Sequence, residues 1–163
     1  MRAALLAFAM AATAGCAAAN SAAIPAAAPS AVEVGSDTLR GTFVLEGSDP
    51  APIPVLHTAA GRVALDDVPP AMQRLVQLDL WVRGTAEGPD RFRVDAFLVR
   101  GAGGQPAWDG TLERSGSAFA LRLSGGSLHA LAGAPEAFAG LVGRRVWVVE
   151  TPAQTVASYG VIQ

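Results

Sequence analysis

Leu75–Gly84 reads LVQLDLWVRG and Leu141–Glu150 reads LVGRRVWVVE, and the similarity of these two stretches decides how the rest of the chain is interpreted. Each opens with Leu-Val, crosses polar positions and ends in an apolar run that contains a tryptophan. Trp81 and Trp147 are 147 − 81 = 66 residues apart, and the leucines that open the two stretches have the same spacing. Internal similarity at a long fixed spacing is typical of a duplicated module. We therefore expect two modules in this chain of 163 residues.

The segments around the first stretch predict short strands and one helix. Within Gln77–Arg83, Leu78, Leu80 and Val82 alternate with the other residues, which is the pattern of a half-buried strand. Pro70–Val76 predicts a short helix, because prolines and acidic residues at its start suit a helix N-terminus. The other predicted strands of this module are 39–46, 53–58, 61–65 and 91–100.

The same order recurs after a glycine-rich segment, 101–106, that we interpret as a linker. Gly110-Thr111-Leu112 repeats the pattern of Gly41-Thr42-Phe43, and Ala134–Gly143 predicts a second short helix that ends at glycine. The predicted strands of this second module are 108–114, 118–123, 127–131, 144–150 and 156–162.

A helix between the third and fourth strands is the order of an OB-fold, a small five-stranded barrel. The sequence therefore predicts a mainly β protein with two tandem five-stranded OB-like barrels, at 38–101 and 107–163, each with one short helix between strands three and four. The alternative is a single β-sandwich or barrel of about ten strands. Modules of about sixty residues have marginal cores, so we expect the two modules to pack together.

The N-terminus carries the features of an export signal. Ala3–Ala12 is an unbroken apolar run that is too short to span a bilayer, and Thr13–Gly15 places small residues before Cys16. This arrangement resembles the lipobox of bacterial envelope lipoproteins, although that family usually has leucine where this chain has Thr13. The resemblance implies removal of residues 1–15 as a signal peptide and acylation of Cys16.

Residue Ala17, which is not aspartate, follows the cysteine, and in the lipoprotein class this implies an outer-membrane lipoprotein that faces the periplasm. The competing interpretation is ordinary secretory cleavage after Ala14, which would leave a soluble periplasmic or secreted protein with a free thiol. Residues 16–37 are rich in alanine and proline, so we expect a tether between anchor and modules.

Composition and motifs argue against several activities. The net charge is −2 and no basic stripe is present, so we expect no nucleic-acid binding. His57 and His129 have no partner at metal-ligand spacing, so we expect no metal site. The chain has no G-x-S-x-G nucleophile motif, and its glycine-rich segments lack the lysine of a phosphate loop. We therefore expect neither enzymatic activity nor a cofactor.

The candidate site residues are Trp81 and Trp147, which the alternation places opposite the apolar faces of their strands. Aromatics at equivalent outward positions can stack a ligand. The interpretation that we favour is burial where the modules meet, since large aromatic side chains are mostly buried.

The sequence thus predicts a non-enzymatic, lipid-anchored envelope protein that presents its modules to another envelope component, a protein or a saccharide. The alternative is a soluble exported barrel that binds a small ligand or saccharide.

Lipidation can be tested at Cys16. We expect mass spectrometry to find acyl chains on the thiol of the exported wild-type protein, and Cys16→Ser to yield an unprocessed or soluble form. Cleavage after Ala14 with an unmodified thiol would falsify the lipoprotein interpretation.

Overall fold

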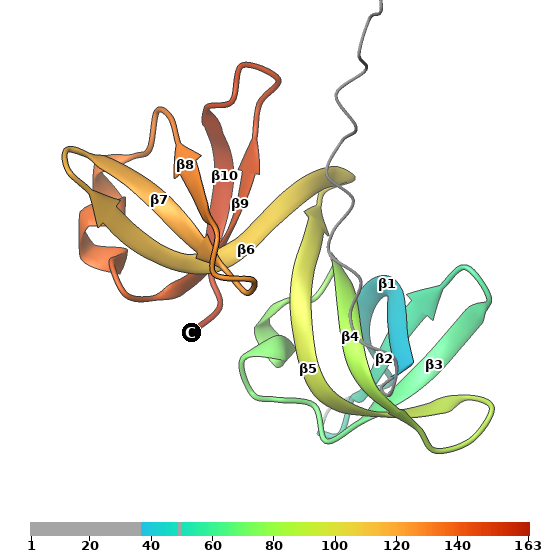
Figure 1. Ribbon diagram of the computed structural model, residues 1–163. Coiled ribbons are helices and arrows are strands. Elements are labelled where there is room, and N and C mark those ends of the chain that lie inside the picture. Colours follow the sequence, from blue (N-terminus) through green and yellow to red (C-terminus); the bar gives the residue numbers. More distant parts are fainter. Residues whose placement is uncertain (1–36, 49) are drawn as a thin grey trace, which may run out of the picture. The chain divides into compact units, whose positions relative to one another are not determined.

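The computed structural model describes residues 37–48 and 50–163 (Figure 1). They form ten β-strands and two short 3-10 helices, so the protein is mainly β, as predicted. No helix in this part of the chain is long and apolar enough to cross a membrane. The signal peptide, Cys16 and the tether up to residue 36 lie outside the described residues.

The strands of the first half, β1 to β5, close a circuit of backbone pairing. Strand β1 pairs with β2 and β4, β2 with β3, and β5 with β4, all antiparallel, while β3 and β5 pair in parallel. Because the circuit returns to β1, each of these strands has a neighbour on both sides. The bounds are β1 Asp37–Glu46, β2 Ile53–Thr58, β3 Gly61–Asp66, β4 Leu78–Ala86 and β5 Arg91–Ala102, with η1 Met72–Arg74 between β3 and β4.

The second half, β6 to β10, repeats this pairing order. Strand β6 pairs with β7 and β9, β7 with β8, and β9 with β10. The parallel contact between the ends of β8 and β10 is a single isolated bridge, Ala132 with Thr155, where the first half has a short ladder. The bounds are β6 Gln105–Ser115, β7 Ala118–Leu123, β8 Leu128–Leu131, β9 Arg145–Glu150 and β10 Val156–Val161, with η2 Glu136–Leu141 between β8 and β9.

The two halves correspond down to single ladder positions. Trp81 of β4 pairs with Arg40 of β1, and Trp147 of β9 pairs with Asp109 of β6. One position further along each ladder, the pairs are Gly41 with Leu80 and Gly110 with Val146. The 66-residue echo in the sequence is therefore an echo of strand register.

Both predicted helices are 3-10 turns and not α-helices. In the first, the Leu75 N–H donates to the Met72 carbonyl, and residues with positive φ, Asp67 and Gln77, stand on either side of the segment. The second runs from Glu136 to Leu141, with Gly143 at φ 84° just beyond it. Segments this short gain too few i→i+4 bonds to offset the cost of α-helix nucleation.

The predicted linker at 101–106 is instead a tight β-hairpin turn. Strand β5 runs to Ala102, β6 begins at Gln105, and these two residues pair directly. Gly103 and Gly104 form the two-residue loop with φ of 58° and 75°. Positive φ at both positions is what such a turn requires and what glycine supplies without strain.

Two clusters of buried apolar side chains fill the structure. The larger one lies among β1 to β5 and includes Phe43, Leu56, Met72 and Phe92. The smaller one lies in the second half. It consists of Leu112, Leu121, Leu131, Phe138, Val146 and Val148.

Two equivalent glycines allow close approach of neighbouring strands, and they supply a test of the register. A Cβ at Gly41 would lie 2.2 Å from the His57 carbonyl oxygen, and one at Gly110 would lie 2.6 Å from that of Arg122. We expect Gly41→Ala and Gly110→Ala each to lower the free energy of unfolding by roughly 1–3 kcal/mol in denaturant titrations, because backbone must move.

Gly125 provides the control, since a Cβ there meets nothing within 4 Å. The variant Gly125→Ala should unfold like the wild type. Wild-type stability in Gly41→Ala or Gly110→Ala would contradict the strand register described above.

Candidate functional site

A buried ion pair connects the strands of the two halves. The Asp109 side chain is only 1% exposed and accepts hydrogen bonds from Arg145 Nε and Nη2 at 2.8 and 2.7 Å. It also accepts one from the Val99 backbone N–H at 2.7 Å. Arg145 Nη2 donates in addition to the Phe97 carbonyl at 2.7 Å. All these bonds join β5 to β6 and β9, so the carboxylate is fully satisfied and its role is structural.

The same two ladder positions carry the opposite charges in the first half. Asp109 corresponds to Arg40 and Arg145 corresponds to Asp79, because each pair faces the same partners in its ladder. Asp79 accepts a hydrogen bond from Thr42 at 2.6 Å instead of pairing with Arg40. The Arg40 guanidinium is thereby left for another contact.

That contact is with Trp81, which lies under two arginines. The Cζ atoms of Arg40 and Arg100 lie 4.1 and 4.4 Å from the centroid of its ring. The Nε of Arg100 is buried and has no hydrogen-bond partner among the described residues. Burial lowers the pKa of Arg100, and the positive charge of Arg40 also lowers it, against the effect of Asp109. Two like charges are thus held close to one indole.

Trp147 occupies the equivalent ladder position but has different surroundings. It is half-buried and packs against the larger core cluster. Its ring also covers Gly160 on the paired strand β10, where a Cβ would lie 2.6 Å from the indole Nε1. This glycine therefore lets the ring lie flat on the sheet. The two candidate tryptophans are not interchangeable, although the sequence presents them as equivalents.

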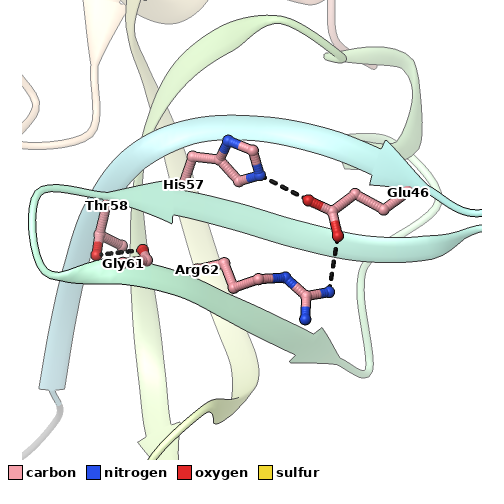
Figure 2. Close-up of polar contacts among 5 residues, drawn as sticks. All are labelled: Glu46, His57, Thr58, Gly61 and Arg62. Carbon is pink, nitrogen blue, oxygen red and sulfur yellow. Dashed lines mark hydrogen bonds and ion pairs between the residues drawn. The ribbon is translucent and has the colours of Figure 1, made fainter.

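One of the two histidines lies on the exposed face of the first half. Glu46 of β1 bridges His57 of β2 and Arg62 of β3, each at 2.7 Å (Figure 2). The hydrogen bond with His57 is the largest cause that lowers the pKa of Glu46, and Arg62 adds to it. The three side chains are half or more exposed except for Glu46, so their contribution to stability is small.

The other histidine belongs to a more enclosed group in the second half. His129 of β8 stacks on Trp108 of β6, with ring centroids 4.1 Å apart and planes at 23°. Its Nε2 lies 2.8 Å from Glu150 Oε2 at the end of β9. The other carboxylate oxygen, Oε1, is buried and has no hydrogen-bond partner among the described residues. We call these residues the Trp108 cluster.

Sequence reasoning missed the Trp108 cluster and the two arginines on Trp81. The residues of each group come from strands far apart in the chain, and no local pattern joins them. A position-by-position comparison of the two modules would have found Trp108 and Glu150, because they break the repeat. Among the described residues, no group of three His, Cys, Asp or Glu side chains is arranged to hold a metal ion.

Comparisons with known proteins provide no family assignment. No protein-family model matches the chain, and neither the curated proteins nor the solved structures contain a match to it. Function is therefore argued from the chain's own residues.

The surroundings of the tryptophans predict unequal losses on truncation. We expect Trp147→Ala to lower the free energy of unfolding by about 3 kcal/mol, because it removes packing against the core. Trp81→Ala should cost about 1 kcal/mol, the scale of the cation–π contacts that it removes. Thermal or denaturant unfolding of both variants measures the difference, and equal losses would contradict it.

Proposed function

We propose that this chain is a non-enzymatic, lipid-anchored cell-envelope protein that presents two OB-like β-modules as a binding or scaffold unit. Its anchor is Cys16, and its place is the outer membrane on the periplasmic side. The anchor rests on the resemblance of residues 1–16 to lipoprotein leaders.

The proposal of two OB-like modules is supported by the pairing order. In each half the first strand pairs with the second and fourth, and the third contacts the fifth in parallel. A 3-10 turn stands between the third and fourth strands of each half. A small closed barrel with this strand order is what an OB-fold has, and such barrels serve as platforms for ligands and partners.

The observation that carries the binding role is the pair of arginines on Trp81. Neither Arg40 nor Arg100 forms an ion pair within the described residues, while Asp79, the nearest carboxylate in the ladder, is taken by Thr42. Holding two guanidiniums together without a carboxylate costs free energy by repulsion. An acidic partner surface would remove that cost, so we propose an acidic envelope protein as the partner.

A second candidate function is a soluble exported barrel that binds a small ligand or saccharide. The Trp108 cluster favours it, since an exposed indole and an unpartnered carboxylate oxygen lie next to each other there. The two candidates use different strands and are tested separately.

The partner surface can be tested by photocrosslinking in cells that export the full chain. Thr38 is exposed and lies two positions before Arg40, on the same side of β1, so a photoreactive residue placed there leaves both arginines intact. We expect a discrete adduct from position 38, and its loss when Arg40→Glu or Arg100→Glu is added.

The matched control is Arg74→Glu, which reverses an exposed charge on η1, away from Trp81. It should leave the adduct in place. Absence of any adduct, or an adduct that survives reversal of Arg40 and Arg100, would refute the proposed partner surface.

A further inference from the structure

Three positions differ in kind between the two otherwise matching halves. Trp108 pairs with Val148, His129 pairs with Leu121, and Glu150 follows two residues after Val148. In the first half the same ladder positions hold small or apolar residues, two of which pack against the core. These equivalents are Leu39, Val63 and Gly84.

The Trp108 cluster faces the inside of the second half, at one end of its strands. Trp108 is on the same side of β6 as Leu112, which is fully buried. His129 pairs across β7 with Leu121, which in turn faces Leu112. Where the first half closes this end with apolar side chains, the second half places an indole, an imidazole and a carboxylate.

The carboxylate is only half used. Glu150 Oε2 is bonded to His129, whereas Oε1 is buried and has no partner among the described residues. A buried acceptor without a donor is costly, and such groups in native proteins generally have a role. A donor brought by a ligand would satisfy it.

The chemistry of the cluster selects the class of ligand. When His129 donates from Nε2 to Glu150, its Nδ1 is an acceptor, so the pair offers acceptors to hydroxyl groups. Trp108, 37% exposed, offers apolar ring surface beside them. Adjacent hydroxyl donors on an apolar ring face are the chemistry of a sugar. We infer that the Trp108 cluster is a binding site for a neutral saccharide.

Exposure favours a chain of sugars over an enclosed small molecule. The side chains of His129 and Glu150 are 24% and 11% exposed, so the cluster is open on one side. Small-molecule sites usually enclose most of their ligand, which this cluster does not do. The inference deepens the second candidate function and holds whether or not Cys16 is lipidated.

The test is calorimetric titration of the full chain, kept in a detergent without sugar groups, with cellotetraose, maltotetraose and chitotetraose. Titration to about 10 mM reaches sites as weak as about 1 mM. We expect at least one saccharide to bind, and Glu150→Gln and Trp108→Phe each to weaken binding at least about tenfold, a loss of about 1.4 kcal/mol. Thermal unfolding of each variant verifies that it remains folded.

Glu46→Gln is the matched control, because Glu46 is the other glutamate bonded to a histidine, at 2.7 Å. It should bind like the wild type. Failure of all three saccharides to bind, equal weakening by Glu46→Gln, or binding of tetramethylammonium in their place would overturn the inference. None of these results bears on the crosslink at position 38 or on lipidation, so the two proposals fail independently.

Discussion

The arrangement of the strands depends on one buried carboxylate. Asp109 is almost inaccessible to solvent and needs every bond that it accepts, from Arg145 and from the Val99 N–H. Removing one partner of a buried pair typically costs about 3–5 kcal/mol, because the other charge remains without compensation. The Phe97 carbonyl binds the same guanidinium. Strands β5, β6 and β9 are therefore fixed together by a constraint that tolerates little rearrangement.

This constraint also explains why the outward faces of the two halves differ. At equivalent ladder positions the second half has Asp109 and Arg145, which neutralise each other, and the first half has Arg40 and Asp79. With Asp79 bonded to Thr42, the positive charge next to Trp81 is not neutralised within the described residues. An exchange of charge between two positions thus gives one half a structural joint and the other a cationic surface.

The strand order could be predicted from the sequence because alternation and turn residues are local signals. The register followed from the 66-residue spacing, since equal spacing within each module places equivalent residues at equivalent rungs. The helices were wrong in type because Met72 and Phe138 are buried as helical residues would be, yet their segments are single turns. The surroundings of Trp81 were not predictable, because Arg40 and Arg100 reach it only across strand pairs.

Backbone spacing explains why only one half holds the Trp108 cluster. Gly84 is the first-half equivalent of Glu150, and a Cβ there would lie 1.8 Å from the Arg93 carbonyl oxygen. No side chain fits at that rung unless β4 and β5 separate. In the second half the β9–β10 ladder shifts register after Val156, and the parallel contact is reduced to one bridge. The looser closure admits a glutamate where the tighter ladder admits only glycine, so the weaker pairing is what makes room for polar chemistry.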